Sequence, residues 1–289
     1  MGYLVGVTLL WAFSFSLIGV YLAGQVDSYL AVLVRVVLAA LVFLPFLRPS
    51  LLVGRQRLAL MGLGAIQLGV MYIFFYQSFL LLSVPEVLLF TIFTPLYIAL
   101  LDDWLFGRFT PFYLLTAGLA VLGAAVIRYQ GLDSGFWLGF LVVQGANLCF
   151  ALGQVGYRRL STSLPDSLPR HSVFAWFYLG ALAIALPAFA LLGDASAMPT
   201  TGIQWGILAW LGLVASGLGY FLWNLGAVRV DAGALAIMNN ALIPAGLLVN
   251  LVIWNRDADL ARLSLGGAII LGSLVLNEWW LRRRRLQPA

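Results

Sequence analysis

The chain has 289 residues, of which 63% are hydrophobic and only 9% charged, against roughly a quarter charged in an ordinary soluble domain. A water-soluble fold of this size could not bury so much apolar side chain, so the composition excludes an ordinary soluble enzyme or binding domain. The formal net charge is +5, and every basic residue is an arginine. In a membrane protein arginines anchor cytoplasmic loops, so this charge indicates no nucleic-acid partner.

Ten apolar stretches, each about the length that crosses a bilayer, follow one another along the chain. The first lacks a basic leader and a cleavage site, so we expect a retained helix rather than a removed signal peptide. The predicted transmembrane helices cover residues 2–23, 29–47, 58–83, 86–104, 110–127, 135–157, 172–193, 202–228, 232–253 and 263–281. The sequence therefore predicts an all-α integral membrane protein whose helices contact the lipid bilayer.

The placement of arginine predicts the orientation. With the N-terminus in the cytoplasm, twelve of the sixteen arginines fall in cytoplasmic segments, three fall on the opposite side, and Arg35 lies within the second span. This positive-inside bias puts both termini in the cytoplasm, which requires an even number of spans. We therefore expect a multi-pass protein of a bacterial inner membrane.

The chain also repeats itself. A proline and two glycines recur at a constant offset of 149 residues, as Pro95, Gly118 and Gly123 against Pro244, Gly267 and Gly272. The aromatic-rich segments 72–76 and 220–224 recur at an offset of 148. A unit of five spans must enter the membrane from the opposite side in its second copy. We expect ten helices as two inverted five-helix repeats around a central cavity, residues 1–130 and 135–285, within one transporter domain 1–289.

Four short motifs add a family resemblance. They are LWAFSF at residues 10–15, VRVVLA at 34–39, Thr94-Pro95 and Ile243-Pro244. With the five-plus-five duplication, the chain resembles the EamA-like branch of the drug/metabolite transporter superfamily, and within it the YddG-type exporters of aromatic and other amino acids. The resemblance covers essentially the whole chain and implies a ten-helix basket around a central cavity. A glutamate that the family usually has about thirteen residues after the repeat proline is replaced here by Arg108 and Asp257.

Polar and aromatic side chains in the middle of spans are the candidate binding residues, because amides and hydroxyls are unwelcome against lipid and suit a wet cavity. Tyr72 and Tyr76 are four residues apart and share one helix face. The expected cavity lining is Trp11, Ser14, Tyr72, Tyr76, Tyr97, Asn147, Tyr220, Trp223, Asn224 and Asn239. Ordinary helix packing is the alternative for each. Asn147 could equally form a hydrogen bond between helices. Of Asn239 and Asn240, we expect one to form such a bond and the other to face the substrate.

Two prolines and one arginine have further candidate roles. Pro95 and Pro244 interrupt helical hydrogen bonding in mid-span and are candidate hinges for alternating access, although the carbonyl groups that they free could instead face the cavity. Arg35 is a charge inside a span. It could hold a substrate carboxylate, snorkel to the interface, or bond to neighbouring carbonyl groups.

These features predict a secondary transporter, without cofactor or metal and acting as a monomer, that exports aromatic and other neutral amino acids by alternating access. Other small hydrophobic or cationic metabolites or drugs are alternative substrates. The absence of a deep carboxyl group favours a facilitator or an exchanger over a proton pump. A membrane-embedded enzyme is disfavoured because the chain has one histidine, His171, and no HExxH motif or deep acid pair. A channel is disfavoured because no ring of charges or filter sequence is present.

Overall fold

The protein is described by a computed structural model over residues 1–82, 84–107, 109, 111–128, 136–165, 167–254 and 260–286. Within these ranges every regular element is a helix. In chain order they are α1 (Gly2–Tyr21), α2 (Ser28–Phe43), η1 (Leu44–Phe46), η2 (Pro49–Leu51), α3 (Gly54–Gly64), η3 (Ala65–Val70), α4 (Met71–Leu81), α5 (Val84–Phe90), η4 (Thr91–Phe93), α6 (Thr94–Phe106), α7 (Pro111–Arg128), α8 (Phe136–Ser161), α9 (Arg170–Leu192), α10 (Gly202–Trp210), η5 (Leu211–Gly219), α11 (Tyr220–Ala227), α12 (Ala232–Asn240), α13 (Leu242–Trp254) and α14 (Leu260–Leu286). Arg108, Asp257 and the boundary between the two expected repeats lie outside the described residues.

The helices have the length and composition that a bilayer requires, because a helix satisfies its backbone hydrogen bonds internally. Among the described residues, seven helical segments are long and apolar enough to cross a membrane. Three further apolar helices are shorter, at Pro111–Gly123, Ala232–Gly246 and Ser264–Asn277, and they fall within the expected fifth, ninth and tenth spans. The all-α membrane class predicted from the sequence is therefore confirmed.

Four of the expected spans are not continuous α-helices. The third and the eighth each contain a π-helical segment, η3 and η5, a rare geometry that is frequent at functional sites. The fourth changes from α5 through the 3₁₀ turn η4 to α6, and the ninth is broken at Ala241 between α12 and α13. Pro95 and Pro244 lie in the first turn of α6 and of α13. A first-turn N–H has no helical partner, so each proline lies where a helix begins. We had expected each proline to interrupt a helix in its middle instead.

Side-chain caps fix where several helices begin. The Asp27 carboxylate accepts a hydrogen bond from the Leu30 backbone N–H at 2.8 Å and starts α2. Asp231 does the same for α12, through the Ala234 N–H at 2.9 Å. These caps satisfy backbone donors that would otherwise be orphaned at a helix N-terminus.

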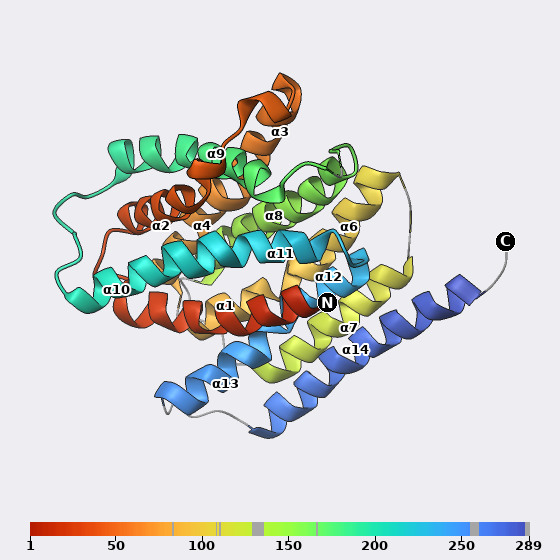
Figure 1. The fold of residues 1–289 in the computed structure, drawn as a ribbon. Helices are drawn as coiled ribbons and strands as arrows, with labels where there is room; N and C mark the ends of the chain where they lie inside the picture. The colour runs from red at the N-terminus through yellow and green to blue at the C-terminus, as the bar shows by residue number, and fades with distance from the viewer. Residues whose placement is uncertain are drawn as a thin grey trace.

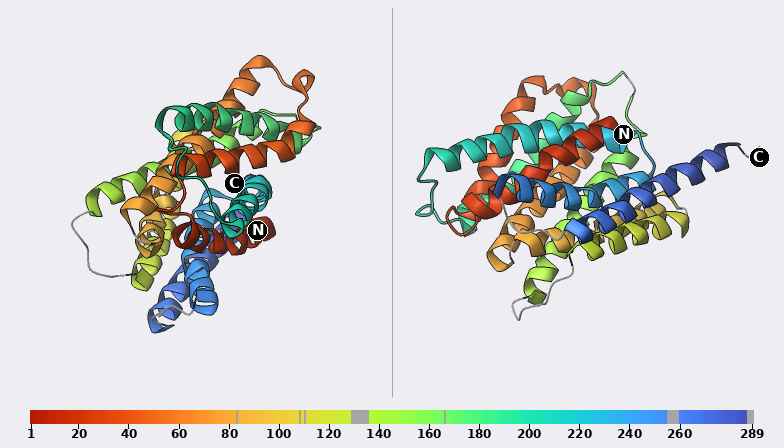
Figure 2. Two further views of the ribbon diagram at one scale, coloured as in Figure 1. Left: turned by 90° about the vertical axis from the view of Figure 1, so that its left-hand side faces the viewer. Right: turned by 90° about the horizontal axis from the view of Figure 1, so that it is seen from below.

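The helices form one bundle whose members run roughly along a common direction (Figure 1). Helices α2, α3 and α9 gather at the top of that view and α7, α13 and α14 at the bottom, with α1, α8 and α11 between them. The pair α7 and α14 lies side by side there and again in the view from below (Figure 2). The middle layer is where the two parts of the chain meet, because α1 packs against α11 and α13 while α8 packs against α4 and α6.

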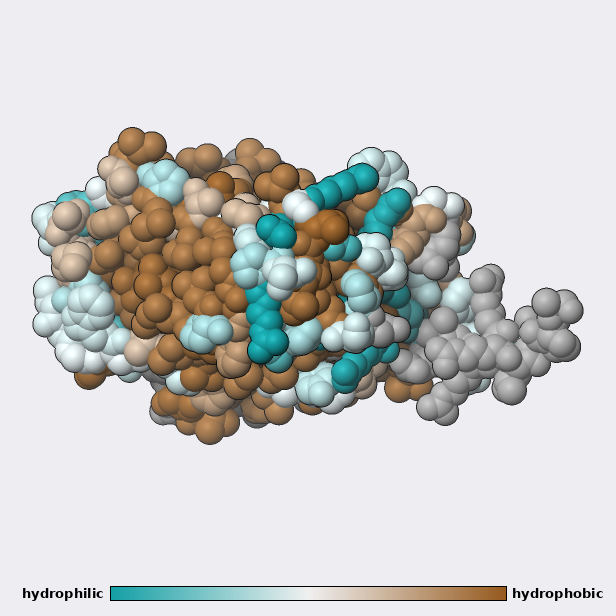
Figure 3. Space-filling view, turned by 45° about the horizontal axis from the view of Figure 1, so that its top comes forward, coloured by the Kyte–Doolittle hydropathy of each residue, from teal (hydrophilic) through white to brown (hydrophobic). Residues whose placement is uncertain are grey.

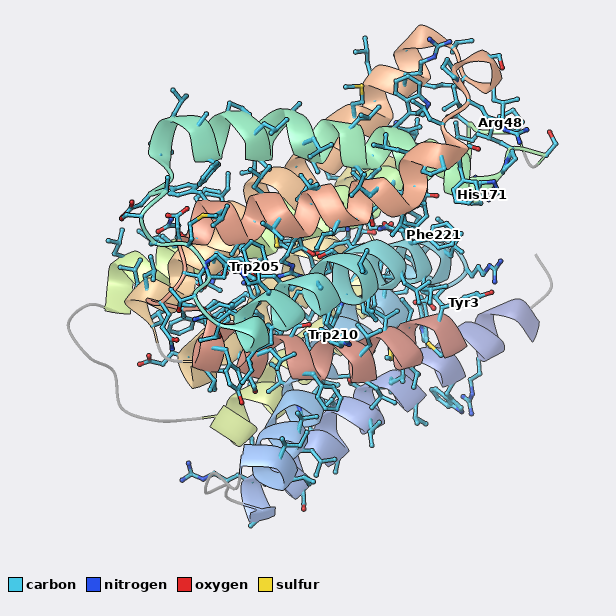
Figure 4. All side chains as sticks on the ribbon, turned by 60° about the vertical axis from the view of Figure 1, so that its left-hand side comes forward. Tyr3, Arg48, His171, Trp205, Trp210 and Phe221 are labelled. Carbon is cyan, nitrogen blue, oxygen red and sulfur yellow. The ribbon has the colours of Figure 1, made fainter. Side chains whose placement is uncertain are left out.

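The surface of the bundle is apolar around its middle. Figure 3 shows a broad hydrophobic band with hydrophilic residues gathered on either side of it. Large apolar side chains such as Leu191, Leu138 and Leu271 are exposed, as expected for a surface that faces lipid rather than water. In Figure 4, Tyr3, Arg48 and His171 lie at one end of the bundle and Trp205 lies away from it. The molecule is an integral membrane protein.

Candidate functional site

A cavity of about 90 Å³ lies in the middle layer of the bundle. Its walls come from α1, α2, α4, η4 and α6 in the N-terminal half and from α8, α11, α12 and α13 in the C-terminal half. Apolar atoms dominate the walls, and a few polar groups converge on the space. This is the composition expected of a site for a largely apolar ligand with a small number of polar groups.

One wall of the cavity is aromatic. The Trp11 ring lies 4.8 Å from that of Tyr220, 4.9 Å from that of Trp223 and 5.8 Å from that of Phe150, between centroids. Each indole N–H has a partner, since Trp11 Nε1 donates to the Ala215 carbonyl at 2.9 Å and Trp223 Nε1 to Gln154 Oε1 at 3.0 Å. With their polar ends fixed, these rings offer rigid apolar faces to a ligand.

Arg35 brings a positive charge to the cavity although its side chain is buried. Its guanidinium donates to the hydroxyls of Ser216 at 3.0 Å and of Tyr72 and Tyr76 at 3.1 Å each, and its Cζ lies 4.2 Å from the Tyr72 ring centroid. Among the described residues no carboxylate pairs with it. Neutral hydroxyls and a ring face therefore surround an uncompensated cation.

Two asparagines bring amides to the cavity wall. Asn147 Nδ2 donates to the Phe90 carbonyl at 2.7 Å and to Gln144 Oε1 at 3.2 Å. Asn239 Nδ2 donates to the Leu235 carbonyl at 2.8 Å and to Gln154 Oε1 at 3.4 Å. Because both amide hydrogens of each asparagine are used inside the protein, the carbonyl oxygens are the groups available to a ligand.

The helix breaks beside the cavity are satisfied by side-chain amides. The Phe90 carbonyl, at the end of α5, accepts from Asn147 and also from Gln144 Nε2 at 3.2 Å. The Ile92 carbonyl in η4 accepts from Asn240 Nδ2, at the end of α12, at 3.2 Å. In a membrane a broken helix requires such partners for its freed carbonyls, so these amides hold the fourth span in its interrupted form.

The structure brings most of the expected site residues together. Those lining the cavity are Trp11, Ser14, Arg35, Tyr72, Asn147, Tyr220, Trp223 and Asn239. Three others are absent from its walls. Tyr76 bonds to Arg35, Tyr97 donates its hydroxyl to Gln144 Oε1 at 3.2 Å, and Asn224 Nδ2 donates to the Tyr220 carbonyl of its own helix at 3.0 Å.

Sequence relatives give the chain its family. It is 54% identical over 287 residues to the probable biotin transporter of Pseudomonas aeruginosa, covering 99% of this chain and all of the relative. It is 52% identical to the biotin transporters of Salmonella typhimurium and of Escherichia coli K12, covering all of this chain and 96% of each relative. The chain belongs to the family of these biotin transporters. No family model matches it.

A structural comparison agrees on the fold. A solved structure described only as the crystal structure of a protein superposes with a TM-score of 0.77 at 21% identity and covers 97% of each chain. At this identity the likeness concerns the fold alone. Membership of a transporter family also makes the chain a transporter rather than an enzyme.

The biotin transporter family overturns the function expected from the sequence. The assignment to EamA-like amino acid exporters is wrong, because relatives over half identical along the full chain are named biotin transporters. The expectation of amino acids as the substrate is therefore wrong, and so is their export. The alternative of a drug or another small metabolite is also contradicted. The four short motifs were too weak to carry a family, and an arginine with amides and aromatic rings suits many small carboxylates.

Several residues of the site were missed from the sequence. Gln154 and Ser216 are fully buried and bond to residues of the cavity wall, but their partners are 69 and 181 residues away along the chain. Phe150 and Thr94 line the cavity and look like packing residues in the sequence. A glutamine in mid-span was a usable signal for Gln154, since buried amides need partners.

Proposed function

We propose that this protein carries biotin across a bacterial inner membrane by alternating access, with the central cavity as the binding site. The family relationship supports the substrate. The observation that carries the site is Arg35, a buried cation at the cavity without a carboxylate partner among the described residues. Biotin is a monocarboxylate with a compact bicyclic ring and a four-carbon chain, so it has the charge that the site lacks and apolar surface for the aromatic wall.

The energetics of Arg35 favour an anionic substrate. A charge within the membrane is costly and is normally paired or turned toward water. The three hydroxyl acceptors solvate the guanidinium but leave its charge uncompensated. In these hydrogen bonds only the arginine is ionised. A carboxylate would add the opposite charge and could accept two parallel N–H bonds from the guanidinium. Binding biotin therefore relieves a cost that the empty protein carries.

For the remaining contacts, the aromatic wall of Trp11, Tyr220 and Trp223 is proposed to cover the ring system and the carbon chain of biotin. Ser14, Asn147 and Asn239 are proposed to meet its polar ureido group. Tyr72 contacts the substrate beside Arg35, and Tyr76 acts through Arg35.

We further propose ten spans arranged as two inverted repeats, residues 1–130 and 135–285. Shifting η3 by 148 residues, the offset between Tyr72 and Tyr220, puts it inside η5. Contacts also recur, since α2 packs against η5 as α9 packs against η3, and α1 packs against α13 as α8 packs against α6. Pro95 and Pro244, each at the start of the second part of a broken span, are the proposed hinges.

We also propose that both termini lie in the cytoplasm, because ten spans put them on one side and the placement of arginine favours the cytoplasmic one. The test of this orientation uses the two corresponding loops after the second and seventh spans. In a Cys149→Ser background, Ser50→Cys and Ser196→Cys place single thiols in exposed positions. An impermeant thiol reagent added to intact cells should label position 196 and leave position 50 unlabelled. Labelling of both positions from the same side would exclude inverted copies.

The function is tested with purified protein in liposomes. Counterflow of labelled biotin should occur, unlabelled biotin should compete, and phenylalanine should not. Biotin methyl ester keeps the rings and chain but lacks the negative charge, so it should compete at least about tenfold less well, the equivalent of one charge-assisted interaction. Absence of biotin counterflow would refute the function, and equal competition by the ester would refute the role of Arg35.

A further inference from the structure

Two glutamines, the half-buried Gln144 and the fully buried Gln154, bond to the two asparagines of the cavity wall. Both belong to α8, and neither lines the cavity. Gln144 bonds to Asn147, and Gln154 bonds to Asn239. We propose that Gln144 and Gln154 are positioning residues that turn the carbonyl oxygens of Asn147 and Asn239 toward the substrate, and that this pair of acceptors recognises the two ureido N–H groups of biotin. The inference rests on the proposed function and says how the site recognises the ureido group of its substrate.

The orientation of Asn147 is fixed by its partners. The Phe90 carbonyl can only accept, so the atom that lies 2.7 Å from it must be the amide nitrogen. Gln144 Oε1 accepts the other hydrogen of that nitrogen, while Gln144 Nε2 donates to the same Phe90 carbonyl. The Asn147 carbonyl oxygen bonds to nothing in the described part of the chain and is open to the cavity. A free acceptor on this wall requires a donor from the ligand.

The orientation of Asn239 is fixed in the same way. Its nitrogen donates to the Leu235 carbonyl, which again can only accept. Gln154 Oε1 takes the second hydrogen at 3.4 Å, and Gln154 Nε2 donates to Asn239 Oδ1 at 3.4 Å. The same Gln154 oxygen accepts from Trp223 Nε1, so one side chain sets both an amide and an indole of the wall. Asn239 Oδ1 keeps a second lone pair for a ligand.

The polar groups of the cavity are thus of two kinds, hydrogen-bond donors and hydrogen-bond acceptors. Arg35 offers hydrogen-bond donors and a positive charge, whereas Asn147 and Asn239 offer acceptors. The complementary ligand has an anion at one end and N–H donors at the other. In biotin the carboxylate is separated from the two ureido N–H groups by the carbon chain, so one molecule meets both requirements.

The test compares biotin with an analogue methylated on one ureido nitrogen, which keeps the carboxylate and loses one donor. In counterflow with the wild-type protein, biotin should compete about tenfold better than the analogue, since one hydrogen bond to a buried group is at stake. Gln144→Leu and Gln154→Leu should each raise the KM for biotin several-fold. The variant whose asparagine faces the methylated nitrogen should leave the KM for the analogue nearly unchanged. The tenfold preference should therefore fall toward one.

Gln67→Leu is the matched control. Gln67 is also a fully buried glutamine, but it lies outside the cavity wall and its amide has no hydrogen-bond partner among the described residues. This variant should keep the tenfold preference. Tyr97→Phe is a milder second variant, because it removes only the hydroxyl that donates to Gln144 Oε1; it should lower the preference partly even where the leucine variants fold poorly.

The outcomes separate the two proposals. If wild-type protein shows no biotin counterflow, the proposed function itself fails. If the wild type transports biotin and each glutamine variant weakens biotin and the analogue equally, the glutamines support the fold only and the positioning role is overturned. A wild type that does not discriminate the methylated analogue also overturns it.

Discussion

Two contacts in this protein are alike in geometry and opposite in chemistry. We define the polar seam as the packing of α2 on η5 and the apolar seam as the packing of α9 on η3 and on the end of α3. In the polar seam the glycine Gly212 lies against Arg35 and Leu38. In the apolar seam Gly64, which is 148 residues earlier, lies against Phe177. Where one seam holds an arginine, the other holds a phenylalanine.

The difference teaches how two contacts of similar geometry can differ in charge. In both seams a glycine lets the backbone of one helix approach the other closely, and both hold a π-helical segment. In the polar seam the Ser216 hydroxyl, together with that of Tyr72 in the neighbouring α4, accepts hydrogen bonds from the guanidinium. The seams share a close backbone approach at a glycine, and they differ in whether a buried cation lies there.

The largest expected effect comes from putting a charge in the wrong seam. Phe177→Arg would bury a cation beside η3, where Leu68 stands 148 residues before Ser216 and carries no hydroxyl. It should cost about 3–5 kcal/mol, the range for an uncompensated buried charge. Thermal unfolding in detergent, followed by size-exclusion chromatography, measures this loss. Phe177→Leu is the control and should be far milder, because it keeps the seam apolar. A variant as stable as the control would mean that the two seams are solvated alike.

Removing the charge from the polar seam should instead affect transport. Arg35→Gln keeps hydrogen-bonding ability and loses the cation, so biotin counterflow should fall about 100-fold, equivalent to about 2.7 kcal/mol. Its unfolding temperature should not fall, since a costly buried charge is gone. Arg229→Gln, at an arginine that lies over the Tyr3 ring outside the cavity, should transport normally. If Arg35→Gln transports biotin at the wild-type rate, the charge in the polar seam has no role in transport.

A smaller change tests the hydroxyls around Arg35. Tyr76→Phe removes one acceptor of the guanidinium and should raise the KM for biotin about fivefold, for a hydrogen bond worth about 1 kcal/mol. Initial rates of counterflow at varied biotin concentration give this value. Tyr157→Phe is the comparison, at a buried tyrosine outside the cavity wall, and its KM should not change. Equal effects in the two variants would indicate general packing.

The smallest effect is expected in the apolar seam. Gln67 in η3 is fully buried, and its amide has no hydrogen-bond partner within the described residues. Gln67→Leu should therefore raise the stability of the protein by about 1 kcal/mol, because an unsatisfied buried amide is removed. A shift of the unfolding temperature upward, at unchanged biotin counterflow, is the expected result. A downward shift would show that the amide has a polar partner.

The sequence reveals the membrane class and less of the site. Hydropathy alone predicts helices, because the bilayer permits few other structures. It also singles out Arg35, since a charge in a span is rare. It does not reveal that Ser216 and Gln154 support the cavity, because their partners come from distant helices. Tyr97 shows the same limit, because a mid-span tyrosine can stand behind a cavity as well as on its wall.

The substrate was the largest error, and its cause is physical. Amino acids and biotin both have a carboxylate and N–H donors, so Arg35 with Asn147 and Asn239 suits either class in a list of residues. What separates the two ligands is the distance between anion and donors, which only a folded cavity or a close relative reveals. The sequence indicated interruptions near Pro95 and Pro244 but did not reveal that each proline lies in the first turn of a helix, because a proline at a helix start and one that bends a helix look alike in a sequence.

Because Arg35 is buried without a compensating acid among the described residues, the empty and loaded forms of the carrier differ electrically. The vacant site has one positive charge, and occupation by a carboxylate neutralises it. A voltage across the membrane, worth about 2.3 kcal/mol per unit charge per 100 mV when the whole field is crossed, then acts on the vacant form as it reorients. In such a carrier, voltage would change the rate at which the empty protein reorients and would have little effect on the step in which the loaded protein reorients.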